Sequence, residues 1–259
     1  GMLVMEEFFD GWYGPKNQNS NDFSTHFNAV IPSGNHILGA ADGDKWYQFI
    51  VRSTVKRDRN NPSVIIWSAG NELNHMTGYS DANSQPYAQD MHNIITALDS
   101  RPLTVGNNES KIRGIENYMD VVGGNYYPRT WATISTSKPV ILTETSSASS
   151  SRGFYKSLGQ SGYELSAYDT YAPDWGDSAE ANLYYTQAYD RVSGQFIWTG
   201  FDYIGEPTPW NNYNTNNAQG EPISSFFGVI DTAGFAKDNA YLYKSIWDSG
   251  EHTLNLLPG

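Results

Sequence analysis

Two glutamates each follow a short apolar run. Glu72 comes after the run Ser63–Ser68 and the residues Ala69-Gly70-Asn71, and Glu144 directly follows Pro139–Thr143. Apolar runs without alternation are typical of strands buried on both faces, as parallel strands are. Either glutamate alone could be a helix cap or an ion-pair partner. Together they are more informative, because catalytic groups of α/β barrels come from the carboxyl ends of several parallel strands.

Two convergent carboxylates can hydrolyse a glycosidic bond. One protonates the leaving oxygen, and the other meets the oxocarbenium-like carbon. Their environments must differ, since the acid needs a raised pKa and the nucleophile needs donors that keep it ionised. We therefore interpret Glu72 and Glu144 as a candidate catalytic pair.

The elements that must position this pair alternate between apolar runs and helical patterns. The predicted strands are Met2–Met5, Ser63–Ser68, Pro102–Val105, Asp120–Val122, Pro139–Thr143 and Gly194–Thr199. The predicted helices are Lys45–Asp58, Gln85–Leu98, Ala179–Ser193 and Asn239–Asp248. This order indicates an α/β fold with a parallel sheet and outer helices, either doubly wound or closed into a barrel.

Composition narrows the substrate class. The 259 residues carry 16 Lys plus Arg against 28 Asp plus Glu, a net charge of −12, which disfavours nucleic acids and anionic membranes as partners. Aromatic residues make up 14% of the chain and suit either the apolar faces of sugar rings or a large core. No cysteine is present, so disulfides and thiolate metal sites are excluded.

Neither a membrane span nor a signal peptide is visible in this sequence. The compartment is left open, with a bacterial extracytoplasmic location favoured. The length matches the roughly 250 residues of one α/β barrel.

The segment Arg57–Glu72 closely resembles the acid/base strand of glycoside hydrolase family 2, whose barrel domain carries β-galactosidases, β-glucuronidases and β-mannosidases. The resemblance implies a (β/α)8 TIM barrel in which Glu72 is the general acid/base and Asn71 contacts the sugar 2-hydroxyl. The segment Lys138–Glu144 is similar to the family's nucleophile strand, which makes Glu144 the nucleophile and implies retention of configuration.

Further segments extend the resemblance to the β-galactosidase branch. Gly123-Gly124-Asn125-Tyr126-Tyr127 is similar to the segment whose tyrosine donates to the nucleophile, a role we assign to Tyr126 with Tyr127 as the alternative, and we place Asn125 at the substrate. The segment Gly194–Trp210 looks like the eighth strand and its loop. It would supply the stacking platform Trp198 and, beside it, Asp202 and Glu206.

The acidic residues after the first strand look like a family segment that holds a cation or a sugar hydroxyl. We expect Asp10 to contact substrate. No metal site is predicted and no cofactor is required; a structural or assisting cation is compatible with the segment but cannot be assigned. His75, His26 and His252 show no metal-ligand spacing and are interpreted as surface or packing residues.

The chain departs from the family pattern in extent. If its first strand is the family's third, about six of the eight strands are present, and residues 1–259 form one partial barrel domain of a larger polypeptide. The predicted function is a retaining exo-β-galactosidase, with a β-glucuronidase or another family 2 β-glycosidase as the alternative.

Two other classes are compatible with the sequence: a glycan-binding fragment without turnover, and a doubly wound domain whose glutamates are structural. The last is disfavoured because Gly11 and Gly14 do not form a phosphate-binding turn.

Overall fold

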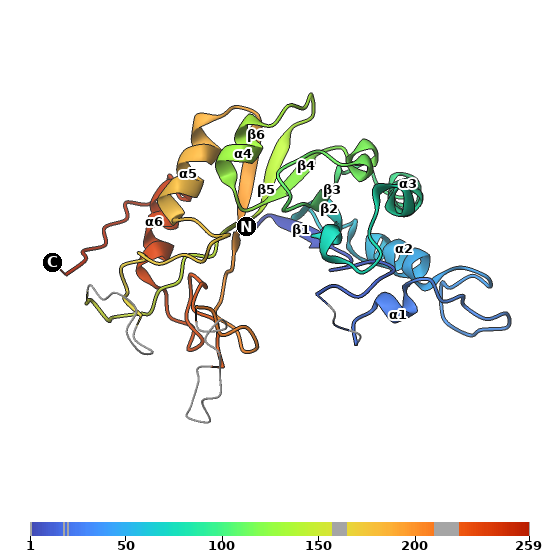
Figure 1. The fold of residues 1–259 in the computed structure, drawn as a ribbon, viewed down its shortest axis with the longest axis horizontal. Helices are drawn as coiled ribbons and strands as arrows, with labels where there is room; N and C mark the ends of the chain where they lie inside the picture. The colour runs from blue at the N-terminus through green and yellow to red at the C-terminus, as the bar shows by residue number, and fades with distance from the viewer. Residues whose placement is uncertain (1, 18, 20, 157–164, 210–222, 259) are drawn as a thin grey trace. The chain divides into compact units, whose positions relative to one another are not determined.

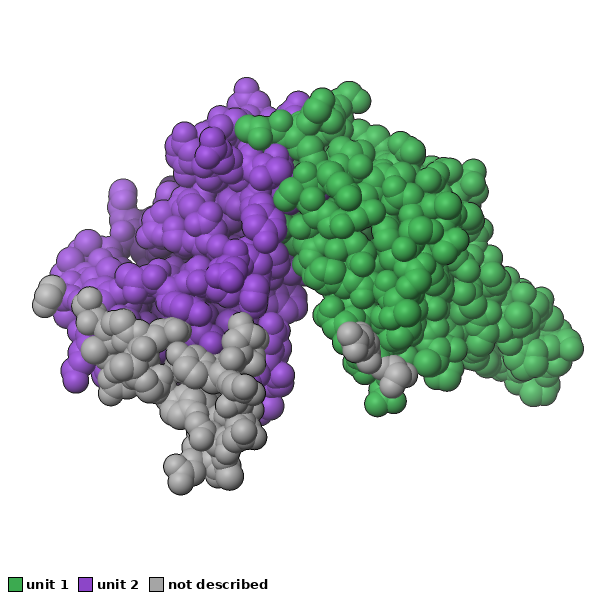
Figure 2. Space-filling model, in the orientation of Figure 1, with its two compact units in different colours: residues 1–125, 133–141 green, residues 126–132, 142–259 purple. Residues whose placement is uncertain are grey.

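The computed structural model describes residues 2–17, 19, 21–156, 165–209 and 223–258. Trp210, the last residue of the expected eighth-strand segment, lies outside them. The chain divides into two compact units (Figure 2). Unit 1 contains residues 1–125 and 133–141, and unit 2 contains residues 126–132 and 142–259. The prediction of one domain over residues 1–259 stays a prediction.

All six predicted strands are present (Figure 1). They are β1 (Val4–Glu7), β2 (Val64–Asn71), β3 (Leu103–Gly106), β4 (Val122–Asn125), β5 (Val140–Ser146) and β6 (Val192–Trp198). One sheet has the order β1-β2-β3, with both pairings parallel as predicted, and the other has the order β4-β5-β6. Most strands extend two or three residues beyond their predicted carboxyl ends, so Glu144 lies within β5 rather than after it.

The four predicted helices are also present. The helices are α1 (Ser24–Phe27), α2 (Trp46–Asp58), α3 (Asp81–Thr96), α4 (Pro128–Thr133), α5 (Ala179–Ala188) and α6 (Asp238–Trp247), with short 3-10 helices η1 (Leu73–His75) and η2 (Gly114–Tyr118). Helix α3 begins four residues earlier than predicted because the Ser80 hydroxyl accepts from the Asn83 N–H and caps the helix. Among the described helices, none has the length and apolar character that crossing a membrane demands.

The core of unit 1 lies between the β1-β2-β3 sheet and helices α2 and α3. Val51 and Val55 of α2, Met91 of α3 and Trp67 of β2 are fully buried there. Burying such side chains stabilises the fold by about 1.5 to 3 kcal/mol each. This layer fixes the direction of β2, which delivers Glu72.

Unit 2 contains a buried ion pair. The Lys237 Nζ lies 2.7 Å from the Asp202 Oδ2, and the two side chains are 1% and 5% exposed. Lys237 also donates to the Phe226 carbonyl, and the Gly228 N–H donates to the Asp202 Oδ1. Burial raises the pKa of Asp202 and lowers the pKa of Lys237, while their mutual attraction opposes both changes.

We expect Lys237→Met to destabilise the protein by about 3 to 5 kcal/mol, because it leaves an unpaired carboxylate in the interior. The double variant Asp202→Asn, Lys237→Met should recover part of this loss. Urea unfolding of the three proteins measures both effects. A single variant as stable as the parent would contradict the pair's structural importance.

Candidate active site

Glu72 is placed by the end of β2. The strand runs to Asn71, and Glu72 then turns the chain with a left-handed backbone (φ 45°, ψ 47°) into η1. The Glu72 N–H donates to the Gly106 carbonyl of β3 at 2.9 Å. At Gly70 a Cβ atom would lie 2.7 Å from the Trp12 Nε1, so the residue must stay small for Trp12 to donate to the Ala69 carbonyl.

An amide holds the Glu72 carboxylate from one side. The Asn125 Nδ2, at the end of β4, lies 3.1 Å from the Glu72 Oε1 and 2.8 Å from the Asn71 Oδ1. Asn125 is fully buried, so its side chain is fixed by its surroundings. Three residues predicted for the site therefore lie in one hydrogen-bonded group within unit 1.

Two basic groups approach the other oxygen of the same carboxylate. The Lys16 Nζ is 3.8 Å and the His75 Nδ1 is 3.6 Å from the Glu72 Oε2. Lys16 also lies 2.7 Å from the Asp10 Oδ1, and the Asn71 Nδ2 donates to that oxygen at 3.3 Å. The Lys16 side chain is only 9% exposed, whereas that of Asp10 is 67% exposed. Asp10, the expected substrate contact, is thus the accessible member of the group.

A third carboxyl group, Glu7, stands at the end of the neighbouring strand β1. It accepts a 2.8 Å hydrogen bond from the Ser68 hydroxyl. Although the residue keeps solvent exposure, protein packed around its carboxyl group and repulsion from Asp10 and Glu72 raise its pKa to about 7, against the opposing effects of Ser68 and Lys16. A third carboxyl group thus lies close enough to Asp10 and Glu72 for their charges to act on it.

Glu144 belongs to unit 2. Its carbonyl accepts from the Tyr126 N–H at 2.7 Å. The Tyr126 hydroxyl is within hydrogen-bond distance, 3.2 Å, of the Ser147 Oγ. Because Ser147 also donates its N–H to the Trp198 carbonyl, the end of β5 is tied to both Tyr126 and β6. Hydrogen bonds therefore connect Tyr126 and the backbone of Trp198 to the carboxyl end of β5, the strand that contains Glu144.

An aromatic group accompanies Glu144. The rings of Trp198 and Tyr203 meet edge to face, with centroids 6.0 Å apart and an interplanar angle of 84°. The Tyr203 hydroxyl donates to the Glu206 carboxylate. Burial, Glu206 and the negative charge of Glu144 raise the pKa of Tyr203, with burial contributing most. The hydroxyl therefore stays protonated and able to donate.

Asp202 faces a different environment. Its carboxylate is committed to Lys237 and to the Gly228 N–H, as described above. This pairing favours a role in shaping the segment after β6. Its expected contact with substrate stays a prediction.

The structure thus forms two groups of the predicted residues, one within each unit. Asp10, Asn71, Glu72 and Asn125 gather in unit 1, and Tyr126, Glu144, Trp198 and Glu206 belong to unit 2. Lys16, His75 and Tyr203 were not predicted as site residues. His75 follows Glu72 by three residues, a spacing that brings side chains together in a helical turn. Nothing in the spacing of Lys16 points to Glu72.

The described residues contain no cluster of three or more His, Asp or Glu side chains arranged to hold a metal ion. The expectation that no cofactor is required stays a prediction.

Known proteins resemble this chain along its whole length. The sequence is 31% identical to the beta-galactosidase BoGH2A of Bacteroides ovatus, in an alignment that covers 100% of this chain and 33% of that protein. The chain therefore spans about a third of this curated relative.

Solved structures share the fold. A glycosyl hydrolase family 2 member from Bacteroides cellulosilyticus superposes with a TM-score of 0.65 at 24% identity, over 96% of this chain and 27% of that one. A beta-D-glucuronidase of Dictyoglomus thermophilum gives a TM-score of 0.59 at 22% identity, over 81% of this chain and 36% of that one. These likenesses confirm the predicted α/β fold of TIM-barrel type.

The family model that describes the TIM barrel domain of glycosyl hydrolases family 2 matches residues 16–216. This match covers most of the sequence and includes Glu72, Glu144 and Trp198. The chain belongs to glycosyl hydrolases family 2, as part of its TIM barrel domain.

Proposed function

We propose that this chain carries the catalytic groups of a retaining exo-β-glycosidase that acts on terminal β-D-galactosides. The observation that supports this most is the Asn71-Glu72 pair at the end of β2, held by Asn125 and Lys16, in a chain 31% identical to a beta-galactosidase. Such a group orients an acid for proton transfer.

In the proposed reaction Glu72 protonates the glycosidic oxygen while the Glu144 carboxylate attacks the anomeric carbon, so the bond to the leaving group breaks as the glycosyl-enzyme ester forms. Glu72, now ionised, takes a proton from water, which attacks the same carbon and releases Glu144. Asn71 and Asn125 would position Glu72 and the sugar, Tyr126 would support Glu144, and Trp198 with Glu206 would form the sugar platform. Asp10 would accept a hydroxyl proton.

Charge favours a neutral sugar over a uronic acid. The one lysine beside Glu72, Lys16, already contacts the two carboxylates of Asp10 and Glu72. Arg152 pairs with Asp231 at 2.6 Å. The acidic residues around Glu72 would repel the carboxylate of a uronic acid. The Arg152 guanidinium could not act as its partner instead, because it is already paired with Asp231.

The proposal also covers the rest of the polypeptide, its location and its need for cofactors. Because the chain spans about a third of BoGH2A, we propose that it works together with further domains of a longer polypeptide. A bacterial extracytoplasmic location and independence from cofactors belong to the same proposal.

A panel of 4-nitrophenyl β-glycosides assayed with the full-length polypeptide that contains this sequence tests the substrate choice. We expect the β-galactoside to have the highest kcat/KM. A faster β-glucuronide would overturn the sugar assignment while keeping the glycosidase. Galactose binding without hydrolysis of any glycoside would instead support a glycan-binding protein.

Lys16 gives a test of how Glu72 is positioned. Replacing it with methionine removes the ammonium group that lies 2.7 Å from the Asp10 Oδ1 and 3.8 Å from the Glu72 Oε2. We expect kcat/KM for the galactoside to fall by about tenfold, because both carboxylates lose a charged hydrogen-bond donor. Lys16→Arg keeps a positive charge there and should retain most of the activity. Parental kcat/KM in Lys16→Met would argue against a positioning role for Lys16.

A further inference from the structure

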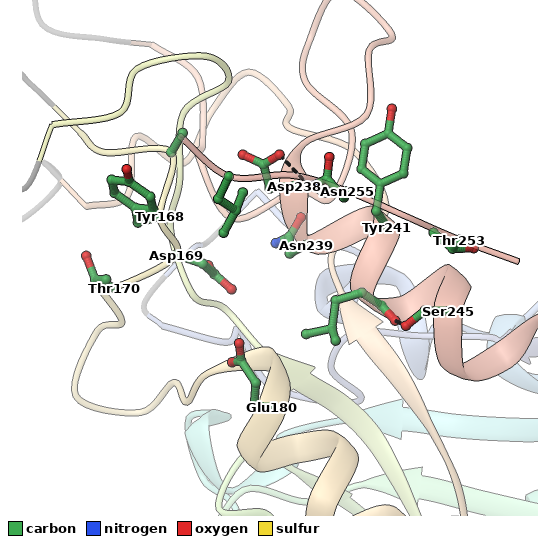
Figure 3. Close-up of a pocket in the computed structure, with 13 residues that line it drawn as sticks. Tyr168, Asp169, Thr170, Glu180, Asp238, Asn239, Tyr241, Ser245, Thr253 and Asn255 are labelled. Atoms are coloured by element: carbon green, nitrogen blue, oxygen red, sulfur yellow. Dashed lines mark hydrogen bonds between the residues drawn. The ribbon is translucent and has the colours of Figure 1, made fainter. Parts of the chain in front are cut away.

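A cavity separate from both glutamates lies within unit 2 (Figure 3). Its volume is about 470 Å³. Four segments surround it: residues 167–170, the first turn of α5, helix α6 and residues 253–257. The cavity is large enough for a small organic molecule or a long side chain.

The charge of its lining has one sign. Asp169, Glu180 and Asp238 line the cavity, and none of the described residues that line it is Lys, Arg or His. Asp238 already accepts hydrogen bonds from the Asn255 Nδ2 at 2.8 Å and from the Tyr155 hydroxyl at 2.9 Å. Lys237, whose positive charge acts on Asp169, is paired with Asp202.

Several oxygen atoms of the lining are buried and lack a partner. Asn239 is 7% exposed, and its Oδ1 accepts no hydrogen bond; the same holds for the Asp169 Oδ1 and the Thr253 Oγ1. Figure 3 shows Asn239, Asp169 and Glu180 turned toward a common space. A buried acceptor without a donor destabilises the fold, so a ligand that brings N–H donors would relieve this cost.

The rest of the lining is apolar or aromatic. Leu242, Leu257 and Ala167 line the cavity together with the rings of Tyr168 and Tyr241. Such surfaces suit an aliphatic chain, and tyrosine faces attract organic cations. The carboxylates are not grouped as a metal site requires, within the part of the chain that the structure describes.

We propose that this cavity binds a primary ammonium group carried on an aliphatic chain. The ammonium has three donors and no acceptor, which matches Asp169, Asn239 and Glu180 as neighbours. A neutral polyol would satisfy some acceptors but would leave the carboxylates without a counter-charge. The source of the group is either a free diamine or a lysine side chain of a polypeptide.

Isothermal titration calorimetry on the full chain with 1,5-diaminopentane and with pentane-1,5-diol tests the proposal. The two probes have the same length and differ in charge. We expect the diamine to bind with a Kd in the millimolar range and the diol to bind at least tenfold more weakly. Equal binding of the diol, or no binding of the diamine, would overturn the proposal.

Substitutions of two cavity residues test whether the diamine binds in this cavity. Asp169→Asn and, separately, Glu180→Gln should each weaken diamine binding at least fivefold, with folding checked by the thermal midpoint. Asp174→Asn removes an exposed carboxylate outside the cavity and should have no effect. Unchanged binding in both cavity variants would overturn the site.

A lysine derivative distinguishes the two sources. If Nα-acetyl-lysine amide binds at least as tightly as the diamine, the occupant is a lysine side chain. If it binds at least tenfold more weakly, the site is built for a free amine.

Discussion

Glu144→Ala is expected to reduce kcat for an aryl β-galactoside by about four orders of magnitude or more, because the covalent intermediate can no longer form. The hydrogen bond from the Tyr126 N–H reaches the backbone carbonyl of Glu144, which alanine keeps. Steady-state kinetics on the full-length polypeptide that contains this sequence measure the loss. Glu251→Ala, an exposed glutamate outside both groups, serves as the control and should keep parental turnover.

A Glu144→Ala protein with parental turnover would remove Glu144 from the reaction. The thermal midpoint of the variant, measured in parallel, separates a folding defect from a catalytic one. We expect the midpoint to stay close to that of the parent.

Glu72→Ala is expected to have an effect that depends on the leaving group. General acid/base catalysis contributes about 10² to 10⁴-fold. A 4-nitrophenyl or alkyl galactoside, which needs protonation, should lose activity over this range. A 2,4-dinitrophenyl galactoside, which departs without a proton, should still react in the first step and give a burst of product.

The second step in Glu72→Ala lacks a base for water. An added small anion such as azide should therefore restore turnover of the dinitrophenyl substrate and yield the β-galactosyl azide. Equal losses for both leaving groups, with no rescue, would contradict the assignment of Glu72 as the acid/base. Lys16→Arg should show neither the burst nor the rescue, because it keeps Glu72 intact.

The positions of the strands could be predicted from the sequence because they depend on local apolar runs. Val64–Asn71 and Val140–Ser146 contain the buried residues that the pattern identified. Their carboxyl ends were placed too early, since Gly70, Asn71 and Glu144 are of residue types that are depleted in strands. Hydrogen bonds to neighbouring strands, such as that from the Glu72 N–H to the Gly106 carbonyl, decide where a strand ends.

The contacts around the glutamates could be predicted only in part. Asn71 is adjacent to Glu72 in sequence, but Lys16 reaches it from a loop that precedes it by more than fifty residues. Asp202 was interpreted as a sugar contact because it follows the last strand, and its partner Lys237 lies beyond a long intervening segment. Such pairings depend on how loops fold over the sheet, and no local pattern encodes them.

The division into two units could not be predicted from a local sequence pattern either. The chain passes from unit 1 to unit 2 after Asn125, the last residue of β4, and again after Ile141, inside β5. No long linker rich in Gly, Pro or charged residues marks either position. The sequence therefore predicted one continuous domain.

In the proposed reaction Glu144 forms a covalent bond with the sugar. Treating the full-length polypeptide with 2-deoxy-2-fluoro-β-D-galactosyl fluoride should trap that intermediate, because the 2-fluorine slows both steps while the good fluoride leaving group keeps the first step fast enough for the intermediate to accumulate. Peptide mass spectrometry should then find one fluorogalactosyl group on the peptide that contains Glu144. A label on Glu72 or on any other carboxylate, with Glu144 unmodified, would contradict the account.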